Sequence, residues 1–240
     1  VMCAGIGTVA DSLVAVEHLV FQERKCTLAE LAERLRSNWA GAEELRLHAK
    51  KKLPKWGNNH PEPDAIARRV TETAAGVINH EPNGKGATFQ MGLWSIDWNR
   101  MFGKKTGATP DGRNSGEELS KNAGATAGMD RRGATALIHS AARLDHTEFP
   151  DGSVLDVTLH PSALAGEDGA ELIVDLVRTY FAAGGQSIQF NVFDAETLRQ
   201  AQQDPERYAS LQVRVCGWNA RFIDLSKEAQ EAFIAAAGEE

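Results

Sequence analysis

Apolar residues in the first third of the chain recur at helical spacing. Between positions 13 and 20 they lie three and four residues apart, which predicts an amphipathic helix. Thr27 and Glu30 form a Thr-x-x-Glu capping box, so we expect a second helix to begin there. The same periodicity predicts further helices over 42–52 and 65–78. This part of the chain is therefore expected to be helical.

Two stretches rich in glycine, asparagine and proline predict irregular structure instead. In the segment 55–63 (KWGNNHPEP), the prolines, asparagines and glycine favour a loop. The segment 103–133 is rich in glycine, and a loop of that length inside a compact domain is uncommon and often functional. Gly112 and Gly185 are both expected to be turn glycines.

The last third of the chain alternates between strand and helix patterns. β-Branched and apolar residues alternate with polar ones over 154–159, 187–193 and 211–216, which predicts three strands. Helices are expected over 169–183, over 194–202 and from Ser226 onward. Because the chain shows no internal repeat and no linker between independent units, this alternation predicts a single α/β fold.

The composition excludes several functional classes. The 240 residues include 26 Lys and Arg against 33 Asp and Glu, a net charge of −7 that disfavours binding to nucleic acid or an anionic membrane. No apolar run approaches the ~20 residues that cross a bilayer. Three cysteines without a C-x-x-C pair favour a reducing cytoplasm over a disulfide framework. The chain begins at Val1 rather than Met, so we expect it to be part of a longer protein.

Two glycine-containing segments resemble nucleotide-binding loops but lack the required context. Residues 5–10 (GIGTVA) match the pattern G-x-G-x-x-A, yet no strand precedes them and predicted helices follow, so we expect a turn that opens a helix. Residues 103–106 (GKKT) lack both the upstream glycine and the hydroxyl residue directly after the first lysine that a phosphate loop needs. The histidines show no His-x-x-x-His or Cys/His spacing, so no metal site is expected.

One glycine near the C-terminal end has a different context. Gly217 lies in the run 214–222 (RVCGWNARF), and its position alone is typical of a turn glycine with positive φ. The whole run, however, resembles the glycyl-radical signature Arg-Val-x-Gly-Tyr-x-x-x-Phe of the pyruvate formate-lyase family. Trp218 stands where that family has Tyr, and Cys216 fills its variable position. The aromatic body of Trp218 is expected to preserve the packing of the loop.

The resemblance follows the order of the family along most of the chain. It includes the runs 103–113 (GKKTGATPDGR), 161–164 (PSAL), 189–192 (QFNV) and 205–208 (PERY), and it reaches back to Asp11. It implies the C-terminal part of a ten-stranded α/β barrel that ends in a glycine-radical domain. Residues 1–100 would then be a helical part of the barrel domain, and residues 101–240 the radical domain, with the radical loop at 214–222.

The same resemblance implies a radical mechanism that needs a second segment of chain. Gly217 would hold the radical. The loop around it would comprise Arg214, Val215, Cys216, Trp218 and Phe222. A separate activating enzyme that uses an iron–sulfur cluster and S-adenosylmethionine would install the radical, so the chain itself would bind no cofactor. The catalytic thiol of the family lies in a Gly-Cys motif that neither Cys3 nor Cys26 matches, so we expect it upstream, on the remainder of the parent chain.

The resemblance also implies a small-molecule substrate. Residues 105–107 and the Arg221-Phe222 end of the signature most resemble pyruvate formate-lyase itself, so a formate C-acetyltransferase is the first expectation. The alternatives are a glycerol or propanediol dehydratase, a choline lyase, an arylacetate decarboxylase, a stand-alone protein that replaces a damaged radical domain, or an inert relative. We expect a cytoplasmic homodimer without nucleic-acid or membrane partners, and an inactive chain when it is isolated.

Overall fold

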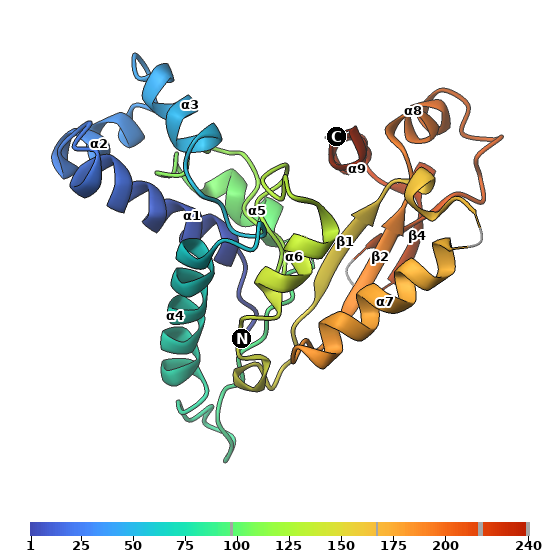
Figure 1. The fold of residues 1–240 in the computed structure, drawn as a ribbon, viewed down its shortest axis with the longest axis horizontal. Coiled ribbons are helices and arrows are strands. Elements are labelled where there is room, and N and C mark those ends of the chain that lie inside the picture. Colours follow the sequence, from blue (N-terminus) through green and yellow to red (C-terminus); the bar gives the residue numbers. More distant parts are fainter. Residues whose placement is uncertain (97, 167, 216–217, 239–240) are drawn as a thin grey trace.

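The protein has a helical part and an α/β part that lie side by side (Figure 1). The structure is a computed structural model, and it describes residues 1–96, 98–166, 168–215 and 218–238. The helical part is formed by the first third of the chain, and the α/β part by the last third. Residues 79–154 connect them through loops and short helices.

Four helices build the helical part. They are α1 (Ile6–Val16), extended by a π-helical turn over Glu17–Gln22, α2 (Leu28–Arg36), α3 (Glu43–Lys51) and α4 (Pro61–Ile78). The capping box before α2 is confirmed, because the Glu30 N–H donates to the Thr27 hydroxyl at 3.2 Å and the Thr27 N–H donates to the Glu30 carboxylate at 2.7 Å. Helix α1 packs against α4, and their contact buries Ala10 and Ala67.

The glycine-rich middle is largely irregular, as predicted. It is bounded by α5 (Trp98–Lys105) and α6 (Gly133–Ala141), and residues 106–132 between them form turns and loops. Arg113 holds this segment in place, because its buried guanidinium donates to the carbonyl oxygens of Thr106, Gly107 and Glu117. The Arg113 guanidinium thus orders one part of this loop, whereas Ala123 packs into a hydrophobic cluster.

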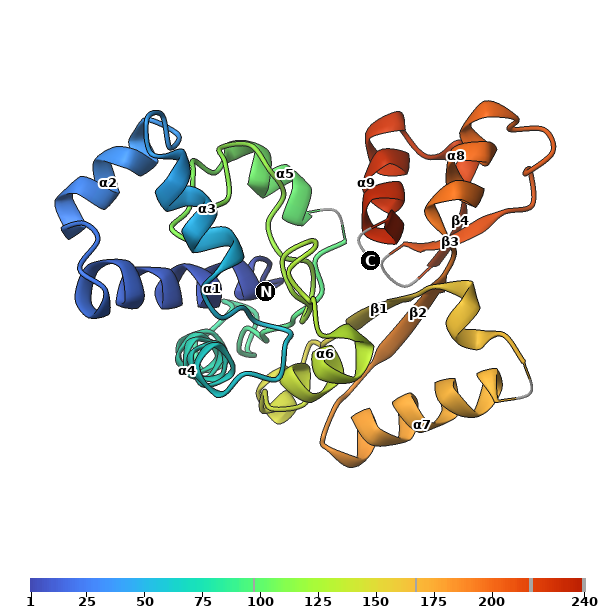
Figure 2. The same cartoon turned by 45° about the horizontal axis from the view of Figure 1, so that its top comes forward.

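Two pairs of strands form the centre of the α/β part. β1 (Leu155–Leu159) and β2 (Ile188–Val192) are parallel, in a register that runs from Leu155 opposite Ile188 to Leu159 opposite Val192. Helix α7 (Gly169–Ala182) makes the crossover and packs along them (Figure 1). β3 (Gln212–Val215) and β4 (Trp218–Arg221) form an antiparallel hairpin. Helices α8 (Ala195–Gln203) and α9 (Lys227–Gly238) pack together beside this hairpin (Figure 2).

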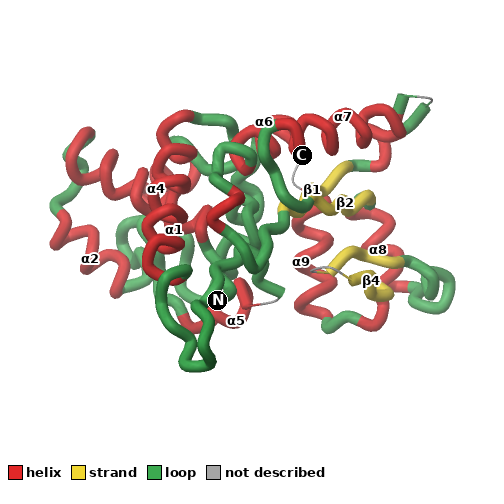
Figure 3. The backbone as a smooth tube through the Cα atoms, turned by 90° about the horizontal axis from the view of Figure 1, so that it is seen from below, coloured by secondary structure: helices red, strands yellow, loops and turns green. Residues whose placement is uncertain are grey.

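The C-terminal elements have a hydrophobic cluster of their own. Leu198 of α8, Val213 of β3 and Ile234 of α9 belong to it. A separate cluster, which contains Leu155 and Tyr180, lies between α6, α7 and the β1–β2 pair. Figure 3 shows α8, α9 and β4 gathered on one side of β1 and β2. The last 45 or so residues therefore pack mainly against one another.

The predicted elements of the last third are confirmed to within about two residues, apart from position 216, which lies outside the described residues. Near the N-terminus the prediction was less accurate, since α1 begins at Ile6 and α4 begins at Pro61 within the predicted loop. Proline fits the first turn of a helix because its missing N–H has no helical partner there. Short 3₁₀ turns occur at His146–Glu148, Pro161–Leu164 and Phe222–Asp224. In the part of the chain that the structure describes, no helix is long and apolar enough to span a bilayer.

Candidate active site

The predicted radical loop lies on the β3–β4 hairpin. Arg214 and Val215 end β3, and Trp218 begins β4 with its backbone opposite Val215. Cys216 and Gly217, which include the predicted radical position, lie outside the described residues. The structure thus brings the two flanks of the predicted radical position together.

The alternating burial of β3 explains why this run forms a hairpin. Val213 and Val215 are 2% and 8% exposed and pack into the C-terminal cluster, whereas Gln212 is exposed and Arg214 is half-buried. This is the pattern of a strand with one face against a core. The apolar residues of β3 therefore fix which face of the strand Arg214 occupies.

Phe222 anchors the far end of the signature. Its side chain is fully buried in the C-terminal cluster, directly after β4. Its N–H donates to the carbonyl oxygen of Leu211 at 2.9 Å, and its own carbonyl accepts from the buried amide of Gln230 on α9 at 3.1 Å. The signature is thus held to α9 at one end.

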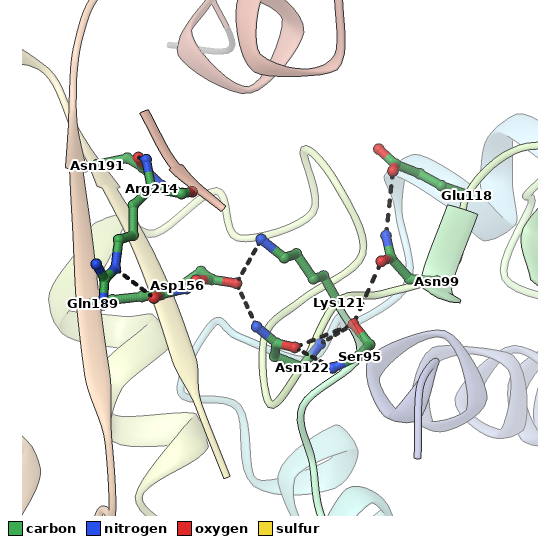
Figure 4. Close-up of polar contacts among 9 residues, drawn as sticks. All are labelled: Ser95, Asn99, Glu118, Lys121, Asn122, Asp156, Gln189, Asn191 and Arg214. Carbon is green, nitrogen blue, oxygen red and sulfur yellow. Dashed lines mark hydrogen bonds and ion pairs between the residues drawn. The ribbon is translucent and has the colours of Figure 1, made fainter. Parts of the chain in front are cut away.

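Arg214 is held at the other end by polar side chains of β2 (Figure 4). Its N–H donates to Oδ1 of Asn191 at 2.8 Å, and its carbonyl accepts from Nδ2 of the same amide at 3.4 Å. Its guanidinium donates to Gln189 at 3.3 Å and to Asn219 of β4 at 3.1 Å. Both the peptide and the side chain of Arg214 therefore have fixed partners.

Asp156 of β1 connects this arrangement to the middle of the chain. Its carboxylate accepts from Gln189 and from Asn122, the latter at 2.7 Å, and forms an ion pair with Lys121 at 3.1 Å. Figure 4 shows these side chains converging on Asp156. The radical-loop flank and the glycine-rich segment are thereby joined through one carboxylate.

The network of polar side chains extends from Asn122 to Ser95, Asn99 and Glu118. Oδ1 of Asn122 accepts from the N–H and the hydroxyl of Ser95 at 2.7 and 3.1 Å. Oδ1 of Asn99 on α5 is a second, more distant acceptor for the single Ser95 O–H, at 3.4 Å, and Asn99 donates to Glu118 at 3.4 Å (Figure 4). Buried polar groups of this kind are partnered because an unpaired one is costly.

Two adjoining cavities lie beside the hairpin. One of about 190 Å³ is lined by Val215, by Asn191 and Asp156, and by Phe233 of α9. A second cavity of about 330 Å³ shares Asp156 and Lys121 with it. The end of β3 therefore faces a cavity with mainly apolar walls, in which Asp156, Lys121 and Asn191 supply a few polar groups, and this combination is typical of a small-molecule site.

The described cysteines do not belong to these cavities. Cys3 and Cys26 line neither of them. Burial raises the pKa of both thiols, so their environments do not favour the reactive thiolate. Among the described residues, no group of three or more His, Cys, Asp or Glu side chains could hold a metal ion.

The sequence had identified Arg214, Val215, Trp218 and Phe222, but not the residues that hold Arg214. Gln189 and Asn191 belong to the run 189–192 that resembles the family, and Asp156 is a polar position of a predicted strand, but neither signal indicated a contact with Arg214. Their alternation places Gln189 and Asn191 on one face of β2. Knowledge of how β1 and β2 pair would have been needed to predict that Gln189 and Asn191 face the interior.

Two protein-family models match the chain. Residues 1–103 match the model described as "Pyruvate formate lyase-like", and residues 119–223 match the one described as "Glycine radical". The second match contains the whole run 214–222.

Enzymes of known function are similar along nearly the whole chain. Trans-4-hydroxy-L-proline dehydratase of Clostridioides difficile is 34% identical over 96% of this chain and 29% of its own length. The isethionate sulfite-lyase of Nitratidesulfovibrio vulgaris is 34% identical over 98% of the chain and 28% of its own length. The glycerol-bound B12-independent glycerol dehydratase of Clostridium butyricum has a TM-score of 0.92 and 40% identity, over 96% of this chain and 29% of that structure.

The chain belongs to the glycyl radical enzymes. Its α/β fold is part of the barrel of these enzymes together with their radical domain, as expected from the sequence. It spans about 29% of the length of the relatives it matches.

Proposed function

We propose that this chain supplies the radical-storing part of a glycyl radical enzyme, with Gly217 as the radical position. The observation that carries the proposal is the signature over 214–222, which lies within the residues matched by the glycine-radical model. A second observation supports it, since Val215, two residues before Gly217, lines the cavity beside β3.

Glycine suits this role because of the geometry of the radical. Removing one hydrogen atom from a peptide Cα leaves an unpaired electron shared with the flanking amide groups, and sharing requires a planar Cα. A side chain at that carbon would clash with the neighbouring peptide groups, whereas glycine has none. In this proposal, Gly217 stores the radical and passes it to a cysteine thiol that the described residues do not supply.

The remaining parts of the radical domain follow from the same proposal. The domain takes residues 101–240, and residues 1–100 belong to the barrel domain. The radical loop extends over 214–222. Its members besides Gly217 are Arg214, Val215, Cys216, Trp218 and Phe222.

The relatives favour a dehydratase or lyase reaction on a small polar substrate. Glycerol dehydratase, hydroxyproline dehydratase and isethionate sulfite-lyase are all similar to this chain over most of its length. Lys121, Asp156, Asn191 and Thr158 provide polar groups in the otherwise mainly apolar walls of these cavities, and such groups can orient a small hydroxylated molecule by hydrogen bonds. We therefore place this class ahead of formate C-acetyltransferase, which stays as the competing reaction.

The proposal implies three partners. A separate activating enzyme with an iron–sulfur cluster and S-adenosylmethionine removes the hydrogen atom from Gly217. A further segment of the parent chain carries the catalytic cysteine. The assembled enzyme is a cytoplasmic homodimer that acts on a small molecule.

The radical assignment is tested on the intact enzyme, activated without oxygen. A carbon-centred radical should appear in electron paramagnetic resonance, with its main splitting from the one remaining α-hydrogen of Gly217. Air should then break the backbone and release a C-terminal piece that begins at about Gly217. Gly217→Ala should abolish both the signal and the cleavage. An intact backbone through positions 216–218, without a prior signal, would refute the assignment.

Gly76→Ala is the matched control. Gly76 lies in α4, has an ordinary φ, and has no atom within 4 Å of where a Cβ would be added. Alanine is favoured over glycine within a helix, so this variant should fold and keep both the radical and the cleavage.

The reaction class is tested by offering the activated enzyme separate substrates. Glycerol, propane-1,2-diol, trans-4-hydroxyproline and isethionate represent the dehydratase and lyase class, and pyruvate with coenzyme A represents the acetyltransferase. Turnover of a member of the first group alone supports the proposal. Formation of formate from pyruvate would reverse the order of the two candidates while leaving the Gly217 assignment intact.

A further inference from the structure

β2 and β3 lie next to each other without forming one sheet. In the described residues, β2 pairs by backbone hydrogen bonds with β1, and β3 pairs with β4. β2 and β3 are nevertheless in contact. The backbone of Arg214 on β3 is linked to β2 by the side-chain amide of Asn191, which bonds both the N–H and the C=O of that residue (Figure 4).

The Asn191 amide can replace the backbone hydrogen bonds that would otherwise join β2 to β3. A primary amide offers one acceptor oxygen and two N–H donors in a plane, so it can satisfy a peptide N–H and a peptide C=O together. Asn191 is 7% exposed, and its backbone is fixed opposite Thr158 of β1. The position of the Arg214 peptide is therefore tied to the β1–β2 pair through a single side chain.

Gln189, two residues earlier on the same face of β2, supports the same arrangement. It accepts from the Arg214 guanidinium at 3.3 Å and donates to Asp156, which Lys121 and Asn122 hold in turn. The side chain of Arg214 is thus oriented by Gln189, whereas its peptide is positioned by Asn191.

We propose that Asn191 is a positioning residue for the radical loop. Arg214 is three residues before Gly217, so the Asn191 amide determines where β3 delivers the chain that carries the radical. Hydrogen-atom removal from Gly217 during activation requires close approach, as later transfer to a thiol does, and a misplacement of about 1 Å can cost about 10²-fold in rate. This inference rests on the proposed function of Gly217.

The variant Asn191→Asp tests the amide with little change of shape. A protonated carboxyl can donate and accept as the amide does, whereas an ionised carboxylate can only accept and repels the Arg214 carbonyl. The charged groups around this position are Asp156 of β1, Arg214 of β3, Lys121 and Glu118 of the glycine-rich segment, and Arg100 of α5. Because the signs of these charges are mixed and position 191 is buried, we expect burial to raise the pKa of the new carboxyl above the ordinary ~3.9 of an aspartate.

The measurement is the number of radical spins per chain in the activated intact enzyme, divided at each pH by the wild-type value. For Asn191→Asp this ratio should be near one at about pH 5 and should fall at least about tenfold by about pH 8, as the carboxyl ionises. The melting temperature at each pH separates this effect from loss of folding. Asn83→Asp, which retains the acceptor for the Lys85 N–H in a loop outside the two cavities, is the matched control and should give a flat ratio.

Asn191→Thr provides a second test that does not depend on titration. Threonine keeps the strand preference, but it offers one oxygen atom on a shorter side chain, whereas Asn191 reaches the N–H and the C=O of Arg214 with two separate atoms. The spin count should therefore fall at every pH without a new pH dependence. Folded Asn191→Asp and Asn191→Thr enzymes with wild-type spin counts at all pH values would overturn the inference. Failure of the wild-type enzyme to form any radical would instead overturn the proposed function.

Discussion

Gly185 lies so close to an aromatic ring that a side chain has no room there. A Cβ at this position would lie 2.4 Å from Cζ of Tyr180, a fully buried residue whose ring packs edge-on to His146 at 5.8 Å. Gly112 has a different constraint, since its φ is 95° and a Cβ would lie 2.7 Å from the Arg46 carbonyl oxygen. The sequence treated both as turn glycines, but only Gly112 has the positive φ that this role requires.

Gly185→Ala should therefore destabilise the protein. Overpacking of a buried ring that cannot move away costs about 1–3 kcal/mol. The free energy of unfolding in urea measures this loss. The helical control Gly76→Ala should instead be neutral or more stable by about 0.5–1 kcal/mol. Equal stability of Gly185→Ala and the wild type would show that Tyr180 can shift.

Single residues of the candidate site were predictable to different degrees. The signature predicted Arg214 and Phe222 as the two ends of the radical loop. The role of Asn191 was not predictable, since it depends on β2 and β3 lying together, and these strands are separated by the whole of α8. A polar residue in a strand pattern indicates a face, but it does not name the partner on the next strand.

Asp11 joins α1 to the segment that precedes α4. Its side chain is fully buried, and Oδ1 accepts from the Trp56 N–H at 2.7 Å. Within the described residues, Oδ2 has no hydrogen-bond partner. Burial raises the pKa of this carboxyl from 3.8 to about 7, although the nearby Lys55 ammonium acts in the opposite direction. The contact between these elements therefore depends on pH.

The free energy of unfolding should fall as the pH rises from 3.8 to about 7. The folded form binds the Asp11 proton more tightly than the unfolded chain, so this contribution is complete below pH 3.8 and is lost as pH rises through about 7. Asp11→Asn should flatten the dependence of the melting temperature on pH between these values. Asp175→Asn, at an exposed position of α7, should leave the slope unchanged. If the melting temperature of Asp11→Asn depended on pH as steeply as that of the wild type, Asp11 would not be the group responsible.

Elements with a strong periodic pattern were predicted well, and elements fixed by tertiary contacts were not. The strands of the last third have β-branched residues in alternation, which is a local property. Helices α5 and α6 and strand β4 were not predicted from the sequence. β4 exists through its pairing with β3, whose residues Gln212 to Val215 lie opposite it.

The molecule leaves apolar side chains exposed on the outside of its α/β part. Phe181 and Val174 of α7 are 48% and 42% exposed, and Val192 of β2 is 42% exposed. In the described residues, β1 and β2 form a sheet of only two strands. Exposed apolar surface and unpaired strand edges both promote association.

The isolated 240-residue chain should therefore form oligomers or aggregate. Light scattering coupled to size-exclusion chromatography gives the mass in solution. Addition of a mild detergent should reduce association that depends on apolar surface. A monodisperse monomer with a cooperative thermal transition would show that the exposed apolar side chains and strand edges do not cause association.

The isolated chain should also fail to turn over pyruvate, diols or choline after activation. The reason is chemical, since Cys3 and Cys26 lie away from the cavities beside the hairpin and have pKa values raised by burial. Product analysis under anaerobic conditions measures this. Turnover by the purified chain would mean that one of its own groups performs the thiol chemistry.

The hairpin is fastened to the rest of the molecule at its two ends. Arg214 is tied to β2 by Asn191, and Phe222 is tied to α9 by Gln230 and to Leu211 by its own N–H. Substitutions of Arg214 or Phe222 should therefore disturb the hairpin more than substitutions between them, apart from Val215 in the hydrophobic cluster and Gly217 at the proposed radical position. Trp218, at the position where the signature that the run resembles has tyrosine, lies between Arg214 and Phe222 in the sequence. Divergent relatives of this enzyme should thus be recognised by the spacing of the terminal arginine and phenylalanine around the glycine, even where the aromatic residue beside it differs.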